Sequence, residues 1–165
     1  MSTVISKARM LLGTFIRDKD IPVPKIVLCR SMPRTNERAA AAYYPPWPNE
    51  ECFDGRFVTN TFGIIALAEH HYDEEFTFEA SLAHEYRHHW QRFNCQGDYN
   101  PPVIRGAKDY QEEICQYFST SFREWDALQF EIRHSPNDVN RNRNEYVRRY
   151  VTQRRKALQL PGLIR

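Results

Sequence analysis

Two histidines and a glutamate stand within five consecutive residues, which read His84-Glu85-Tyr86-Arg87-His88. In a helix, side chains four residues apart lie on the same face, so His84 and His88 can present ring nitrogens to one ion. Glu85 lies beside them and can act as a general base toward a metal-bound water. This H-E-x-x-H spacing is typical of zinc peptidases, and it predicts one Zn²⁺ with His84 and His88 as ligands and Glu85 as the catalytic base.

A catalytic zinc site needs a third protein ligand and a position left open for water. The extended metzincin pattern requires a glycine and then a third histidine, but this chain has Gln91 and Asn94 at those positions, which excludes that class. No histidine lies between residues 90 and 133, which leaves His134 as a more distant candidate. A carboxylate from a helix expected at residues 108–133 is the simpler ligand. The candidates there are Glu112, Glu113, Glu124, Asp126 and Glu131.

The segment from Glu124 to Phe130 matches a second pattern, E-x-x-A-x-x-F. In this respect the chain resembles the short gluzincins (minigluzincin-like zinc metallopeptidases), in which this pattern follows the H-E-x-x-H helix. The resemblance extends over residues 63–130. It implies that Glu124 is the third zinc ligand and that Ala127 packs closely against the active-site helix. Many such proteins have glycine where this chain has Arg87, and we expect that change to alter the rim of the cleft.

The resemblance also implies a fold, the minimal zincin-like core. This core consists of an N-terminal helix, a small twisted sheet, the active-site helix and the glutamate helix.

Several further polar residues are candidates for supporting roles. Tyr110, Tyr117 and His134 are eligible to stabilise the tetrahedral oxyanion, and no pattern chooses among them. Asp126 either orients a ligand histidine or is a solvent-facing helix charge. We expect His89, about 100° around the helix from His88, to face solvent or to support a ligand.

The elements that must position these residues follow from hydrophobic periodicity and from helix-breaking residues. The pattern predicts an α+β fold, with the strand at residues 63–68 serving as the edge strand that pairs with an extended substrate. Thr77 is expected to cap the active-site helix. The predicted helices cover residues 3–17, 78–93, 108–133 and 139–158, and the predicted strands cover residues 25–30, 39–44 and 57–68, the last as one or two strands.

Charge is distributed unevenly along the chain. The net charge of +2 hides nine basic and two acidic residues in positions 133–165, which leaves −5 for residues 1–132. We therefore divide the chain into a metallopeptidase-like domain, residues 1–134, and a basic helical extension, residues 135–165. This extension either docks on the acidic body through an apolar stripe or contacts nucleic acid. The arginines named for nucleic-acid contact are Arg148, Arg149, Arg154 and Arg155.

Composition limits the remaining choices. The 165 residues are 41% hydrophobic and 13% aromatic, enough for a core, and no apolar run is long enough to span a membrane. The four cysteines never form C-x-x-C, and residues 10–16 lack a cleavage site, so we expect a cytoplasmic protein. No pattern indicates an oligomeric state. The sequence predicts a zinc metallopeptidase acting on a protein or peptide. The alternative is a non-catalytic zincin-like domain with a structural metal, whose basic helix binds nucleic acid or a protein partner.

Overall fold

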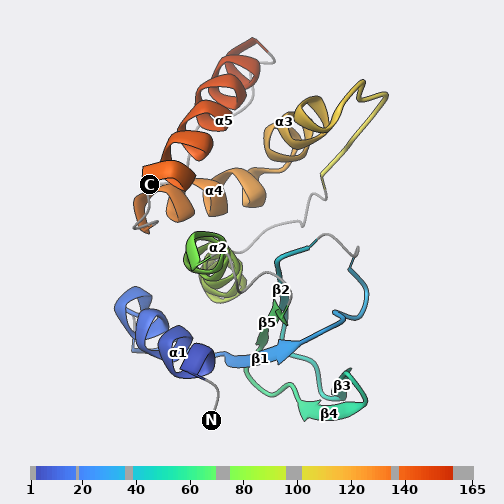
Figure 1. The fold of residues 1–165 in the computed structure, drawn as a ribbon, viewed down its shortest axis with the longest axis vertical. Coiled ribbons are helices and arrows are strands. Elements are labelled where there is room, and N and C mark those ends of the chain that lie inside the picture. Colours follow the sequence, from blue (N-terminus) through green and yellow to red (C-terminus); the bar gives the residue numbers. More distant parts are fainter. Residues whose placement is uncertain are drawn as a thin grey trace.

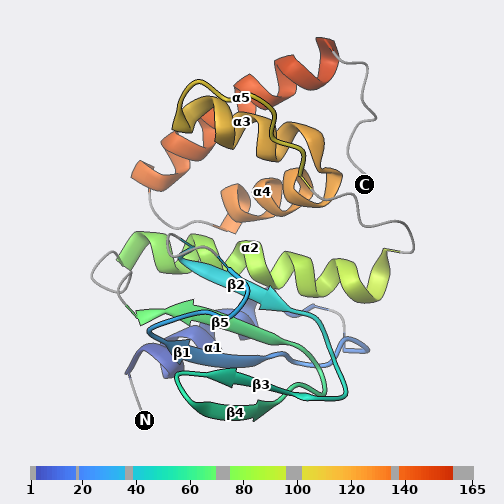
Figure 2. The ribbon, with the colours of Figure 1, turned by 90° about the vertical axis from the view of Figure 1, so that its right-hand side faces the viewer.

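The computed structural model describes residues 3–17, 19–35, 39–69, 75–95, 102–134 and 138–157. Within these ranges the chain is α+β, as predicted, with the helices on one side of a small sheet and a β-hairpin on the other (Figures 1 and 2). None of the described helices is long and apolar enough to cross a membrane. In chain order the elements are α1 (Thr3–Phe15), β1 (Lys25–Cys29), β2 (Ala41–Tyr44), β3 (Glu50–Phe53), β4 (Arg56–Thr59), β5 (Ile64–Ala68), α2 (Glu75–Asn94), α3 (Tyr110–Thr120), α4 (Phe122–His134) and α5 (Asp138–Ala157).

The main sheet has three strands in the order β1-β5-β2. Strand β5 pairs in parallel with β1 and antiparallel with β2, with Ile65 opposite both Ile26 and Tyr43. All five residues of β5 are buried, because their side chains are apolar on both faces of the sheet. The prediction that residues 63–68 form an edge strand is therefore wrong: β5 is central, and β1 and β2 are the edges.

Two layers cover this sheet. Helices α1 and α2 share one hydrophobic core with β1 and β5, built around Leu12, Ile65 and Leu82. The β3–β4 hairpin covers the other face, where Phe53 packs with Tyr44 and the small side chains of β5. The hairpin turns at Asp54 and Gly55, both with positive φ, which suits a tight two-residue connection. Strand β3 was not predicted, because half of its residues are glutamates.

Helices α3, α4 and α5 lie beyond α2, on the side away from the sheet (Figures 1 and 2). Val147 and Val151 of α5 pack on Trp125 and Leu128 of α4. The basic helix therefore docks on the rest of the chain through apolar side chains, which was one of the two expectations for this helix. Helix α4 packs lengthwise along α2. This contact brings the two chemical motifs of the sequence together.

The single helix expected at residues 108–133 is two helices. Ser121 is extended (φ −109, ψ 120) and separates α3 from α4. No proline or glycine marks the break, but Thr120 donates a hydrogen bond to the Gln116 carbonyl at 2.8 Å and competes with the helix backbone. The Ser121 hydroxyl accepts a bond from the Glu124 amide at 3.4 Å, so a new helix begins there and Glu124 lies in its first turn. Helix α2 begins at Glu75, so Thr77 lies inside the helix and does not cap it.

Candidate metal centre

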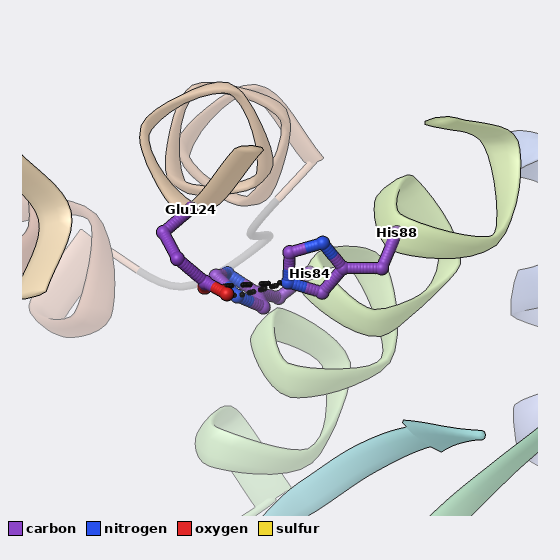
Figure 3. Close-up of side chains that lie close together, drawn as sticks. All are labelled: His84, His88 and Glu124. Carbon is purple, nitrogen blue, oxygen red and sulfur yellow. Dashed lines mark hydrogen bonds and ion pairs between the residues drawn. The ribbon is translucent and has the colours of Figure 1, made fainter. Parts of the chain in front are cut away.

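Three side chains converge between α2 and α4 (Figure 3). Nε2 of His84 lies 3.1 Å from Nε2 of His88, and Oε2 of Glu124 lies 3.2 Å and 3.3 Å from these two nitrogens. Among the described residues, this is the group of histidine, cysteine and acidic side chains whose spacing suits a metal ion. The predicted ligands His84, His88 and Glu124 are thus brought together.

Nδ1 of each imidazole points away from the other two side chains, and its hydrogen-bond partner determines which tautomer is present. The amide nitrogen of Gln91 donates to the Asp126 carboxylate at 2.8 Å and to the Arg123 carbonyl at 3.0 Å, so its oxygen faces Nδ1 of His88 at 3.0 Å. That Nδ1 must therefore carry the proton. Nδ1 of His84 meets the Glu131 carboxylate at 3.2 Å and is assigned as a donor for the same reason.

With both Nδ1 atoms as donors, both Nε2 atoms carry lone pairs. Three electron-rich atoms, two imidazole nitrogens and the Glu124 oxygen, then face one another without a donor between them. Such an arrangement is stable only around a positive charge, either a cation or a proton shared among the three atoms. Tetrahedral zinc bonds of about 2.0–2.1 Å place two ligand atoms about 3.3–3.4 Å apart. The separations of 3.1–3.3 Å therefore fit one zinc ion with little movement of the side chains.

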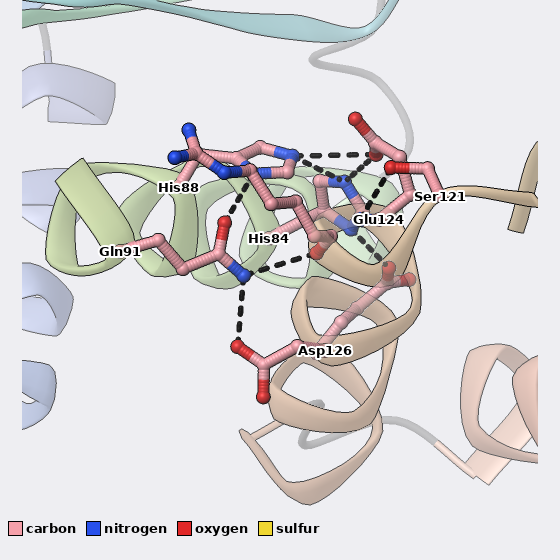
Figure 4. A network of polar contacts seen from close by, with 8 residues as sticks. His84, His88, Gln91, Ser121, Glu124 and Asp126 are labelled. Carbon is pink, nitrogen blue, oxygen red and sulfur yellow. Dashed lines mark hydrogen bonds and ion pairs between the residues drawn. The ribbon is translucent and has the colours of Figure 1, made fainter. Parts of the chain in front are cut away.

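The network around His84, His88 and Glu124 extends back into the protein (Figure 4). Arg87 donates two hydrogen bonds to Asp126, at 2.6 Å and 3.1 Å, and its guanidinium lies 3.8 Å from the centre of the Trp90 ring. A continuous chain of contacts runs from Arg87 through Asp126 and Gln91 to His88. Hydrogen bonds of this kind hold a ligand ring in place and set its basicity.

Electrostatics at the site favour the shared proton on His84 when no cation is bound, together with an ionised Glu124 and a more basic Glu85. Burial acts to lower the pKa of His84, but hydrogen bonds to Glu124 and Glu131 outweigh it and raise that pKa well above its usual value. Burial would raise the pKa of Glu124, but the two histidines lower it far below the usual value. Burial raises the pKa of Glu85, partly offset by the nearby His84 and His88 and by a hydrogen bond from the Tyr43 backbone amide.

The hydrogen bond of the Tyr43 amide shows which edge of the sheet faces the candidate metal centre. Because this amide bonds to Glu85, it points away from β5 and toward the unpaired side of β2. The open edge of β2 therefore lies next to the glutamate of the H-E-x-x-H motif. This amide belongs to the edge strand β2. Hydrophobic periodicity alone did not show whether β2 or β5 is the edge strand.

Other predicted residues are placed elsewhere. The ring of Tyr117 packs on Phe118, which in turn packs edge-on to His84, so Tyr117 is one side chain removed from His84. His134 packs on Phe15 and Phe130 and takes no part in the ligand group. Asp126 reaches His88 through Gln91 rather than directly.

One expectation about α2 stays a prediction and another is corrected. Arg87 is bound to α4 through Asp126, and its effect on the rim of the cleft stays a prediction. His89 is fully buried, with its ring nitrogens at 2.6 Å from the Pro22 carbonyl and 3.2 Å from the Tyr43 hydroxyl. It faces the sheet because α2 is covered by the sheet and α1 on one side and by α4 on the other.

The arginines named for nucleic-acid contact lie on α5. Arg148 and Arg149 are exposed and pair with Glu145 at 3.5 Å and 3.9 Å. Arg154 is partly buried, and the side chain of Arg155 lies outside the described residues. Nucleic-acid binding stays a prediction.

Two residues of the site were not assigned their roles from the sequence. Glu131 was weighed only as a zinc ligand, and Gln91 only as a departure from another family's pattern. The spacing of Glu131, seven residues after Glu124, repeats the same helix face after two turns and is a signal for a second carboxylate beside His84. For Gln91, the position three residues after His88 is the corresponding signal.

No protein-family model matches this chain, and comparison with curated proteins and with solved structures gives no match. The case for a function therefore rests on the geometry of the site and on the sequence motifs.

Proposed function

We propose that the protein is a zinc-dependent metallopeptidase with a minimal zincin-like core formed by α1, the three-stranded sheet, α2 and α4. The observation that carries the proposal is the convergence of three lone-pair atoms, Nε2 of His84, Nε2 of His88 and Oε2 of Glu124, at the spacing of a tetrahedral zinc site. His84, His88 and Glu124 would hold the ion. When bound, Zn²⁺ supplies a Lewis acid that polarises a carbonyl and makes a water easier to deprotonate.

Glu85 is the general base in this proposal. Its carboxylate takes a proton from the attacking water and passes it to the amine that leaves when the peptide bond breaks. The raised pKa of Glu85 suits both halves of that transfer, because a group that titrates nearer neutral pH both accepts and releases a proton readily. The Tyr43 amide holds the carboxylate in place.

The substrate is an extended peptide segment that pairs with the open edge of β2. This edge lies beside Glu85, and backbone pairing to a sheet edge binds a peptide without regard to most of its side chains. The substrate would therefore lie across the ligands between β2 and α4.

The first experiment measures zinc content and activity in matched variants. The wild type is expected to bind one zinc per chain, and the His84→Ala/His88→Ala variant to bind almost none, while His134→Ala keeps its zinc. Equal zinc in the wild type and the double variant would overturn the metal assignment. Glu85→Gln is expected to keep the zinc and the fold but to lose cleavage of a proteome-derived peptide library. Cleavage by Glu85→Gln at the wild-type rate would remove Glu85 as the base, and zinc binding by a wild type without any cleavage would favour the non-catalytic domain.

A further inference from the structure

A cavity lies between the C-terminal end of α1, the second half of α2 and the C-terminal end of α4. Its volume is about 470 Å³, within the range of cavities that hold small molecules, and none of the three metal ligands lines it. One wall is aromatic, formed by Phe15, Tyr86, Trp90 and Phe130. These rings pack tilted or edge to face, with Phe15 and Phe130 5.8 Å apart between centres.

The other side of the cavity is basic. It is lined by Arg17, Arg87, Arg133 and His134, and none of the described residues that line it is acidic. The charge of Arg87 is compensated by Asp126, which lies outside the cavity lining. No ion pair is found for Arg17 or Arg133 within the described parts of the chain, and both side chains are exposed.

The two arginines also lie close enough to act on the neighbouring histidine. Burial, and to a smaller extent repulsion by Arg17 and Arg133, lowers the pKa of His134. Arg133 lies in the last turn of α4 and Arg17 lies two residues beyond the end of α1, and each helix C-terminus contributes a partial negative charge of about half an electron. Two full guanidinium charges exceed those two partial charges, so the mouth of the cavity remains positive.

We propose that this cavity binds a small anion that carries a planar ring, of the size of a nucleoside monophosphate. Arginine side chains bind phosphate and carboxylate groups through paired hydrogen bonds, and Arg17 and Arg133 would hold the anionic group at the mouth. The ring of the ligand would lie against Trp90 and Phe130, the part-exposed rings of this wall, since planar rings stack on aromatic side chains regardless of their substituents. The size of the cavity favours a free small molecule over a polymer.

The test is calorimetric titration of the full-length protein, with and without zinc, using adenosine monophosphate, adenosine and inorganic phosphate as probes. We expect adenosine monophosphate to bind more tightly than either fragment, in both metal states. Arg17→Gln and Arg133→Gln should each weaken it about tenfold, the cost of one charge-assisted contact. Arg149→Gln, which removes an exposed arginine from α5, should change the affinity less than twofold.

Four outcomes would overturn the proposal. The first is that adenosine monophosphate does not bind. The second and third are that adenosine, or inorganic phosphate alone, binds as tightly as adenosine monophosphate. The fourth is that Arg149→Gln loses as much affinity for adenosine monophosphate as Arg17→Gln and Arg133→Gln do. Because the variants replace exposed side chains, they are expected to fold, and thermal unfolding of each variant verifies this before titration. Zinc content of the variants is measured in parallel, so that a failure of this site is distinguished from a failure of the metal centre.

Discussion

The ring of His84 is held between two carboxylates of the same helix. Nε2 lies 3.2 Å from Glu124, and Nδ1 lies 3.2 Å from Glu131. The two glutamates are seven residues apart, which places them on one face of α4 two turns from each other. Glu124 is thus available as a ligand. Glu131 holds the proton on Nδ1 of His84 and leaves Nε2 free to bind a cation.

This relationship makes Glu131 the test of how the ligand ring is supported. We expect Glu131→Ala to lower zinc affinity 10- to 100-fold, the usual effect of removing a hydrogen-bond partner of a ligand histidine. Competition with a fluorescent chelator measures the affinity. Glu113→Ala, which removes an exposed glutamate of α3, serves as the control and should bind zinc like the wild type. Equal affinities of Glu131→Ala and this control would show that Glu131 does not support the ligand.

The Arg87–Asp126 pair is expected to be strongly coupled. Its side chains are 18% and 10% exposed, so removing one partner leaves a poorly solvated charge. Asp126→Ala should lower the free energy of unfolding by about 3–5 kcal/mol. The Arg87→Met/Asp126→Leu double variant should lose clearly less than the sum of the Arg87→Met and Asp126→Leu variants, as measured by urea unfolding. Additive losses would contradict the coupling.

Two glycines offer a matched pair of substitutions. Gly63 has φ +100, and a Cβ there would lie 3.0 Å from the Tyr43 ring and 3.1 Å from Nδ1 of His89. Gly63→Ala should therefore destabilise the protein by about 1–3 kcal/mol. Gly13 lies in α1 with nothing within 4 Å of the added Cβ, so Gly13→Ala should stabilise it by about 0.5–1 kcal/mol. Thermal unfolding of both variants checks the opposite signs.

A pH dependence is expected from His134. Its pKa is below the ordinary 6.5 because of burial and because Arg17 and Arg133 repel the proton. Between the two pKa values the unfolded chain binds more protons than the folded one. This residue's contribution to stability is therefore present above pH 6.5 and is lost as the pH falls through that window. In an NMR titration, Arg133→Gln should move the pKa of His134 up toward 6.5, while Arg149→Gln should not. An unchanged pKa in Arg133→Gln would show that this arginine does not act on His134.

The local part of the site was accessible from sequence, and the long-range part was not. His84, Glu85 and His88 are related by one helical turn, so their spacing determines their geometry once a helix forms. Glu124 was indicated by a resemblance and by its place on the next helix, and its position beside the histidines depends on the packing of α4 on α2. The interruption at Ser121 had no proline or glycine to announce it.

Strand order and burial likewise depended on tertiary contacts. The run at residues 64–68 predicted a strand correctly, but only the pairing with both β1 and β2 shows that it is central. The burial of His89 follows from the layers packed around α2, which helix periodicity does not reveal. Gln91 was unassigned because its role requires Asp126, thirty-five residues away in the chain.

The extended residue between α3 and α4 has a consequence for how the chain tolerates change. In an uninterrupted helix, each inserted or deleted residue turns everything after it by about 100°. Because Ser121 starts a new helix, the angular position of Glu124 is set by α4 and its contact with α2 instead. Helix α3 can therefore change in length while Glu124 keeps its direction, so α3 and α4 are free to diverge separately.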